Sequence, residues 1–215
     1  MDRHILFTQK CWSFILPHHE EYKRLINQIL LVDKNDPNFR LYGPQFQYEK
    51  DHFIETNEQT NVYAWRSDWH SDTHFPILRN LCDEVKPFIT KIIEEEKIRN
   101  TSAIEVNACW INKFKKNDFA VPHQHEPGGW SAVYFMSIPQ GSSTFRVHNP
   151  MNITYNSQLK ENYAVLDINA VEGSVLIMSG NLRHSVTPNL SEETRTTVAM
   201  NFRIFEKFPH KAEEK

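Results

Sequence analysis

The second half of the chain is a series of short segments rich in β-branched and aromatic residues, and this pattern constrains the fold most strongly. Turn-forming pieces such as EPGG, IPQGSS and HNPMN separate the segments. A helical first third followed by at least six such strands predicts helices that buttress a β-sandwich or a jelly roll. The predicted strands cover residues 104–114, 130–138, 143–147, 163–168, 173–178 and 194–205.

The first hundred residues have a different periodicity. Ile5–Leu16 alternates loosely and predicts an opening strand, and apolar residues at helical spacing follow Pro17. A longer apolar stripe begins at Pro76 and ends in the charged run EEEK, which predicts a second helix. Residues 33–60 are polar throughout and predict a long irregular connection.

Composition excludes several classes of partner. The 24 Lys and Arg residues nearly balance 27 Asp and Glu residues, so nothing indicates a surface for nucleic acid or acidic membranes. No apolar run approaches the roughly 18 residues of a membrane span, and MDRHILFTQK lacks the features of a signal peptide. Cys11, Cys82 and Cys109 are scattered and odd in number, which favours reduced thiols and a cytoplasmic setting, the host cytoplasm if the chain is viral.

Three histidines in the β-rich half have the spacing of metal ligands. His123 and His125 lie two residues apart in VPHQHE, so we expect them on one face of a strand. His184 comes 58 residues after that motif and could close the site from a distant strand. A facial set of three protein ligands that leaves open positions is typical of non-haem iron. One HxH pair among 11 histidines can arise by chance, so the prediction of a metal site depends largely on the downstream segment.

That downstream segment places an arginine 11 positions beyond His184, at the start of RTTVAMNF. Strand alternation puts Arg195, Thr197, Ala199 and Asn201 on one face. A guanidinium that points into a β-barrel is a costly unpaired charge unless it meets an anion, such as the carboxylate of a cosubstrate.

Together, WINKFKKNDFAVPHQHEPGGWSAVYFMSIPQGSS, GSVLIMSGNLRHSVTPN and RTTVAMNF resemble the iron(II)/2-oxoglutarate-dependent oxygenases. The resemblance is to their small bacterial and phage branch of prolyl-hydroxylase-like proteins. It is strong over residues 105–205 and weaker before them, where AWRSDWHSDT is similar to the Trp-x-Ser segment of that branch.

The resemblance implies a mainly β (α+β) fold with a double-stranded β-helix core, which is a distorted jelly roll. We expect a single domain over residues 1–215. Residues 1–100 would supply the N-terminal strand and the supporting helices, and residues 101–208 the core that carries the metal site. The resemblance also implies bound Fe(II) and oxidative decarboxylation of 2-oxoglutarate, coupled to hydroxylation of a peptidyl (for example prolyl) or small-molecule substrate.

The ligand set departs from the family's usual His-x-Asp or His-x-Glu motif. By resemblance, His123 and His184 take the two histidine positions. His125 would then replace the carboxylate and give a three-histidine site. Two alternatives stay open, namely a two-histidine site completed by water and a site in which Glu126 is the third ligand.

The resemblance assigns Arg195 to the distal carboxylate of 2-oxoglutarate. Asn112 could hydrogen-bond the same carboxylate, with a turn role at the strand end as the alternative. Ser131 could add a hydroxyl to the pocket, or Tyr134 a phenol if that strand has the opposite phase. Trp130, beside a Gly-Gly pair, is the tryptophan best placed to contact a substrate, and the others are expected in the core.

The sequence therefore predicts an Fe(II)- and 2-oxoglutarate-dependent dioxygenase. Its expected partners are 2-oxoglutarate, dioxygen and an unidentified peptide or small-molecule substrate, with no membrane and no nucleic acid, while a homodimer stays open. The alternative is a cupin-like metal-binding jelly roll without 2-oxoglutarate chemistry. Arg195 discriminates between them, because a cupin has no need of an inward-pointing arginine.

Overall fold

The computed structural model describes residues 10–31, 46–48, 61–98, 101–125, 128–149 and 165–206. In chain order its elements are β1 (Cys11–Ile15), α1 (His19–Leu30), β2 (Phe46–Tyr48), β3 (Val62–Tyr63), β4 (Trp65–Ser67), α4 (Ser71–His74), α5 (Pro76–Glu95), β5 (Thr101–Phe114), β6 (Phe119–His123), β7 (Trp130–Ser137), β8 (Phe145–His148), β9 (Val165–Ile168), β10 (Ser174–Ser179), β11 (His184–Val186) and β12 (Arg195–Glu206).

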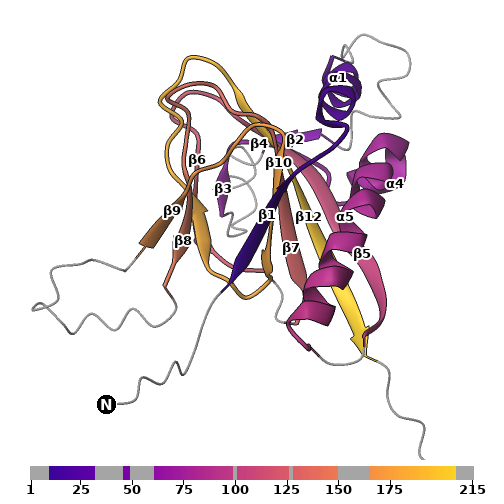
Figure 1. Ribbon diagram of the computed structural model, residues 1–215. Helices are drawn as coiled ribbons and strands as arrows, with labels where there is room; N and C mark the ends of the chain where they lie inside the picture. The colour runs from indigo at the N-terminus through magenta and orange to yellow at the C-terminus, as the bar shows by residue number, and fades with distance from the viewer. Residues whose placement is uncertain are drawn as a thin grey trace, which may run out of the picture.

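Two antiparallel sheets form the body of the molecule (Figure 1). The larger sheet has the strand order β1-β10-β7-β12-β5-β4-β2, and the smaller has the order β3-β6-β11-β8-β9. Neighbours in both sheets are mostly far apart in sequence, as in a jelly roll, where the chain passes repeatedly from one sheet to the other. The predicted double-stranded β-helix core is thereby confirmed.

Strand β12 shows how the sequence positions the site. One face of β12, with Val198, Met200 and Phe202, packs in the apolar core beneath the helices. The opposite face carries Arg195, Thr197, Ala199 and Asn201, as predicted from strand alternation, and lines a cavity between the two sheets. β12 pairs with β5 on one side and β7 on the other, so this cavity face lies in the middle of the larger sheet.

The helices cover the outer face of the larger sheet (Figure 1). Helix α5 begins with Pro76 in its first turn, where a missing N–H costs nothing, and it continues through Pro87. Its apolar stripe is buried against the sheet and comprises Leu78, Leu81, Cys82, Val85, Ile89, Ile92 and Ile93. Helix α1 adds Tyr22 and Ile26 to the same core. None of the described helices is long and apolar enough to cross a membrane.

A turn at Gly173 fixes α1 to the sheet. Gly173 has φ +85°, and a Cβ added there would lie 2.9 Å from the ring of His19. His19 in turn shares a 2.7 Å hydrogen bond between its Nδ1 and the hydroxyl of Tyr134 on β7. The backbone N–H of Leu16 donates to the carbonyl of Gly173 at 2.9 Å, which closes the connection between β1 and α1.

The elements differ from the sequence-based prediction in several places, and β3, β4 and α4 are among the elements that the sequence analysis did not predict. Within 33–60, expected to be irregular, Phe46–Tyr48 form the edge strand β2, and the rest of that segment lies outside the described residues. The opening strand begins at Cys11, and residues 1–9 lie outside the description. The predicted strand ranges did not include residues 184–186, which form the short strand β11 (His184–Val186) and pair with both β6 and β8, so His184 does lie on a distant strand as expected.

Candidate metal centre

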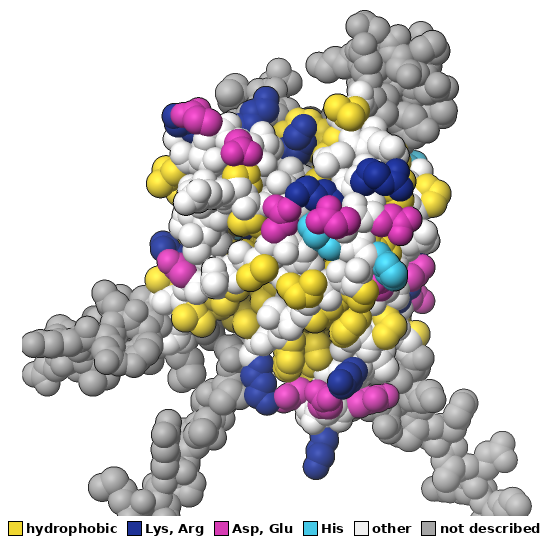
Figure 2. All heavy atoms as spheres, turned by 45° about the horizontal axis from the view of Figure 1, so that its top comes forward, with side chains coloured by type: hydrophobic (Ala, Val, Ile, Leu, Met, Phe, Trp, Pro, Cys, Tyr) yellow, Lys and Arg dark blue, Asp and Glu magenta, His cyan; other side chains and the backbone are white. Residues whose placement is uncertain are grey.

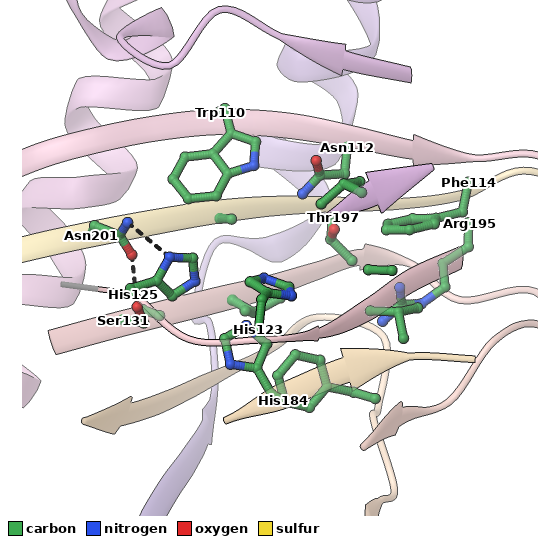
Figure 3. A pocket seen from close by; sticks show the side chains of 17 residues that line it. Trp110, Asn112, Phe114, His123, His125, Ser131, His184, Arg195, Thr197 and Asn201 are labelled. Atoms are coloured by element: carbon green, nitrogen blue, oxygen red, sulfur yellow. Dashed lines mark hydrogen bonds between the residues drawn. The ribbon is translucent and has the colours of Figure 1, made fainter. Parts of the chain in front are cut away.

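A cavity between the two sheets brings together the histidines and the arginine singled out in the sequence (Figure 3). The smaller sheet contributes side chains from β3, β6, β8 and β11, and the larger sheet from β5, β7 and β12. About 480 Å³ of space free of protein atoms lies between its walls, and this figure includes the part that is open to solvent. The polar residues that line it are Asn112, His123, His125, Ser131, His184, Arg195, Thr197 and Asn201.

His123 and His184 are direct partners in the register of the β6–β11 pair. Their ring centroids lie 4.4 Å apart. The Nδ1 of His123 is 2.8 Å from the carbonyl of Val121, and the Nδ1 of His184 is 2.9 Å from the carbonyl of Leu182. A carbonyl can only accept, so each Nδ1 carries the proton and donates. The lone pair of each Nε2 is therefore available to a metal.

His125 reaches the same place by a different route from the one predicted. Strand β6 ends at His123, so His125 lies in the following loop rather than on the same strand face. Its backbone N–H donates to the carbonyl of Gly180 at 2.8 Å, which draws the chain away from the strand direction. The ring centroid of His125 is nevertheless 5.4 Å from that of His123 and 5.1 Å from that of His184. One nitrogen from each of the three rings lies within 4.8 Å of the others, which makes a possible metal site.

Burial keeps these imidazoles in the form that binds metals. It lowers the pKa of His123 and holds the pKa of His184 well below its usual range. The pKa of His125 falls to about 4, mainly through burial and also through repulsion by His123. All three rings are therefore neutral at pH 7, so none has to lose a positive charge before a metal binds. Glu126, the alternative third ligand, lies outside the described residues.

Arg195 lies at the opposite end of the cavity and is only 1% exposed. Within the described part of the chain, none of its three guanidinium nitrogens has a hydrogen-bond partner. The charge faces the rings of Phe114 and Phe135, at 5.3 and 5.6 Å from their centroids. Burial lowers the pKa of Arg195 to about 10, which still leaves the group protonated at neutral pH. A buried, unpaired cation of this kind requires an anion, and a carboxylate fits a guanidinium in a bidentate manner.

Asn112 lies beside that end of the cavity. It pairs in register with Thr197 of β12, and the side chains of both residues line the cavity (Figure 3). The Oδ1 of Asn112 is buried and has no hydrogen-bond partner among the described residues. The alternative turn role belongs instead to Asn189, whose amide donates to the carbonyl of Phe114 at 2.8 Å.

The structure decides which of Ser131 and Tyr134 faces the cavity, a choice that the sequence left open. Ser131 points into the cavity, but its hydroxyl lies 2.7 Å from the Oδ1 of Asn201 near His125, at the end away from Arg195. Tyr134 points to the opposite face of β7 and contacts His19, so the phenolic alternative is wrong. The contact of Ser131 with the cosubstrate stays a prediction.

Among the tryptophans, Trp110 lines the cavity rather than Trp130. Trp130 is buried in the core beneath the helices and contacts Trp12 at 5.5 Å between ring centroids. The ring of Trp110 meets that of His125 at 5.9 Å, and its buried indole N–H has no partner among the described residues. Trp69 packs edge-to-face on Trp110 at 4.5 Å and is 42% exposed, so aromatic rings run from His125 to the surface. Strand alternation from Asn112 would have found Trp110.

The comparisons with known proteins agree with this arrangement. Residues 108–201 match the family described as "Putative 2OG-Fe(II) oxygenase", a range that contains the three histidines and Arg195. No curated protein matches the sequence. The resemblance to iron(II)/2-oxoglutarate-dependent oxygenases is confirmed, and the cupin-like alternative is not favoured.

Solved structures share the fold over nearly the whole chain. A prolyl-4-hydroxylase from Pseudomonas putida matches at TM-score 0.55 and 12% identity, over 93% of this chain and 94% of that chain. HygX from Streptomyces hygroscopicus, with nickel, 2-oxoglutarate and hygromycin B bound, matches at TM-score 0.59 and 11% identity, over 91% and 83%.

Proposed function

We propose that this chain, a 2OG-Fe(II) oxygenase by the family match of residues 108–201, hydroxylates a peptidyl or small-molecule substrate at a three-histidine iron centre. One observation carries the proposal. A single cavity holds three neutral imidazoles at one end and a buried arginine without a hydrogen-bond partner at the other. The imidazoles suit a divalent metal, and the arginine suits the far carboxylate of a cosubstrate that also reaches the metal.

In this proposal His123, His125 and His184 hold Fe(II). All three are uncharged donors, so the ligand set leaves the full charge of the dication in place. That charge strengthens the attraction for a dianionic cosubstrate, while the lack of a carboxylate ligand weakens the retention of iron. The chemistry supplied at this centre by iron, 2-oxoglutarate and dioxygen is oxidative decarboxylation, which releases succinate and CO2 and oxygenates the substrate.

The remaining residues bind and orient the cosubstrate. The guanidinium of Arg195 pairs with the distal carboxylate of 2-oxoglutarate. The amide of Asn112, on the neighbouring strand β5, and the hydroxyl of Thr197, on β12 itself, line the same cavity and are further candidate donors to that carboxylate. Ring contacts from Phe114 and Phe135 keep water from this pair, which makes it stronger than an exposed one. The hydroxyl of Ser131 remains a candidate contact at the other end.

An exposed aromatic residue next to the metal end of the cavity suggests where the substrate binds. Trp69 is half exposed and packs on Trp110, which faces the metal end of the cavity, and the guanidinium of Arg66 lies 3.6 Å above the Trp69 ring. These features support a peptide or small molecule bound on the Trp69 side. On the face seen in Figure 2, Lys and Arg side chains alternate with Asp and Glu side chains, which does not favour nucleic acid.

Two further expectations belong to this proposal. The buried, free thiols of Cys82 and Cys109 support a cytoplasmic setting. The packing of the strand and helices of the first hundred residues onto the core of 101–208 supports a single domain. Assembly as a homodimer stays a prediction.

Anaerobic titration tests the proposed function. Adding Fe(II) and then 2-oxoglutarate to the metal-free protein should produce the weak charge-transfer absorption of a chelated oxoacid in the visible range. Subsequent exposure to dioxygen should yield succinate. If the protein bound iron but 2-oxoglutarate produced no such absorption, the cupin-like alternative would be favoured instead.

A further inference from the structure

We propose that Asn201, anchored by Ser131, orients His125 and, with its Oδ1 turned toward the ring, supports the tautomer that binds a metal, and so makes a loop histidine a competent third ligand. The inference rests on the proposed function, since it assigns the supporting residue of that same site. Asn201 acts through His125 and is a positioning residue.

The geometry is a chain of two side-chain hydrogen bonds (Figure 3). Ser131 and Asn201 are register partners on β7 and β12. The hydroxyl of Ser131 donates to the Oδ1 of Asn201 at 2.7 Å, and the Nδ2 of Asn201 lies 3.4 Å from the Nδ1 of His125. Ser131 is 2% exposed, so the Ser131 end of this chain of hydrogen bonds is buried.

His125 needs this support because its backbone does not supply it. The Nδ1 atoms of His123 and His184 donate to the backbone carbonyls of Val121 and Leu182, two residues back along the same chain. These fixed acceptors determine which nitrogen faces the metal. The described contact of the Nδ1 of His125 is instead with the Asn201 side chain, and His125 lies beyond the end of β6. Its ring orientation therefore depends on β12.

Proton placement gives the contact two states. When the Nδ2 of Asn201 donates to the Nδ1 of His125, a neutral ring carries its proton on Nε2, and that nitrogen cannot bind a metal. Exchanging the two amide atoms presents Oδ1 to His125, which can then carry its proton on Nδ1 and bind metal through Nε2. The same exchange presents Nδ2 to Ser131, whose hydroxyl accepts as readily as it donates.

The hydroxyl of Ser131 can therefore hydrogen-bond the Asn201 amide in either orientation. The metal-bound state is the one in which Oδ1 faces His125. An aspartate at 201 can only accept. It matches the metal-bound state alone, and it adds the carboxylate that commonly supports a ligating histidine from outside. A leucine of similar size matches neither state.

The experiment measures Co(II) affinity, as an oxygen-stable stand-in for Fe(II), in the full-length protein without 2-oxoglutarate. Asn201→Leu should weaken Co(II) binding about 10- to 100-fold, and Asn201→Asp should strengthen it about 10-fold. Ser131→Ala should weaken binding less than Asn201→Leu. Asn169→Asp, an exposed asparagine outside this cavity, adds the same charge elsewhere and should leave the affinity unchanged. Thermal melts check that each variant is folded.

A double-mutant cycle with His125→Ala separates positioning from other roles. If Asn201 acts through His125, both Asn201 variants should lose their effect in that background. A gain from Asn201→Asp that persists without His125 would mean that the new carboxylate binds the metal directly, and it would overturn the inference. Unchanged affinity in Asn201→Leu would overturn it too. In both cases the proposed function would stand if the parent protein binds Co(II) and His184→Ala does not. If the parent protein itself did not bind Co(II), both the inference and the proposed function would be overturned.

A spectroscopic readout adds independent evidence. With Zn(II) bound, imidazole nitrogen NMR should find the proton of His125 on Nδ1, and Asn201→Leu should disturb the signals of His125 while those of His123 and His184 stay in place. A proton on Nε2 of His125 in the Zn(II)-bound protein would contradict the proposed tautomer.

Discussion

His123 and His184 lie directly opposite each other on paired strands, 61 residues apart in sequence, with ring centroids separated by 4.4 Å. The ladder that joins β6 and β11 thus holds these two proposed metal ligands next to each other in the metal-free protein. Each ring is further held by a hydrogen bond to its own backbone.

This pair should be indispensable. His123→Ala and His184→Ala each leave too few ligands to retain iron, so both variants should lose bound Fe(II) and succinate formation. Iron content by mass spectrometry and succinate release are the measurements. If either variant kept both metal and turnover, the assignment of the metal centre would be wrong.

The third ligand should behave differently from the first two. His125→Ala should weaken iron binding, whereas His125→Asp should retain iron, because it restores the motif usual in the family. Glu126→Ala serves as the control and should change little. A larger loss of iron in Glu126→Ala than in His125→Ala would assign the third position to Glu126.

Arg195 should govern the affinity for 2-oxoglutarate and not that for iron. Removing one partner of a buried, hydrogen-bonded charge pair costs about 2–5 kcal/mol, or roughly 30-fold to several-thousand-fold in affinity. Arg195→Ala should raise the half-saturating 2-oxoglutarate concentration for succinate formation by such a factor and leave Fe(II) affinity nearly unchanged. Arg195→Lys should recover only part of the loss, because an ammonium offers a point charge instead of a planar fork. An unchanged half-saturating concentration would disprove the assigned role.

The metal-free protein should lose stability as the pH falls through the histidine range. The pKa of His125 is about 4 in the folded protein, compared with an ordinary value of about 6.5 in the unfolded chain. Between these values the unfolded chain binds the proton and the folded protein does not, so the free energy of unfolding decreases as pH falls. Urea unfolding at pH 7 and pH 5 should show a larger decrease for the parent than for His125→Gln, which cannot titrate. Equal decreases would contradict the lowered pKa.

Gly173 should be far less tolerant of a side chain than Gly141, although both have positive φ. An added Cβ at Gly173 would lie 2.9 Å from His19, while one at Gly141 would meet nothing within 4 Å. Left-handed backbone costs a non-glycine residue about 1–3 kcal/mol at either position. Gly173→Ala should therefore lower the unfolding free energy by more than Gly141→Ala, because it also displaces His19. Denaturant midpoints provide the comparison, and equal losses would show that His19 moves freely.

Much of the cavity could be predicted from residue order alone. Arg195, Thr197, Ala199 and Asn201 alternate with apolar residues on β12, and the structure places all four on the cavity face. The strand pattern after residue 100 likewise predicted the β-rich core.

Which residues of β7 face the cavity could not be predicted in this way. All its residues from Trp130 to Met136 are buried, because helices cover one face and the second sheet covers the other. A strand buried on both faces loses the alternation that distinguishes them. The choice between Ser131 and Tyr134 therefore needed the register with β12.

The position of His125 and its contact with Asn201 could not be predicted from the sequence for a different reason. A residue just beyond a strand end has no periodicity, and the hydrogen bond of His125 to Gly180 comes from a segment 55 positions away. The contact of Asn201 with His125 likewise spans 76 positions. Pairings of this kind depend on which loops meet, and a local pattern cannot specify that.

Strand β12 carries Arg195 at its first residue and Asn201 six residues later on the same face. At a rise of about 3.3 Å per residue, the strand sets these two side chains about 20 Å apart. An insertion or deletion of one residue between them, where no β-bulge absorbs it, would turn everything beyond it to the opposite face of the sheet. Substitutions at Thr197 or Ala199 would change only the wall in between. Within this fold, the wall of the cavity is therefore altered more readily by exchanging side chains along β12 than by changing the length of that strand.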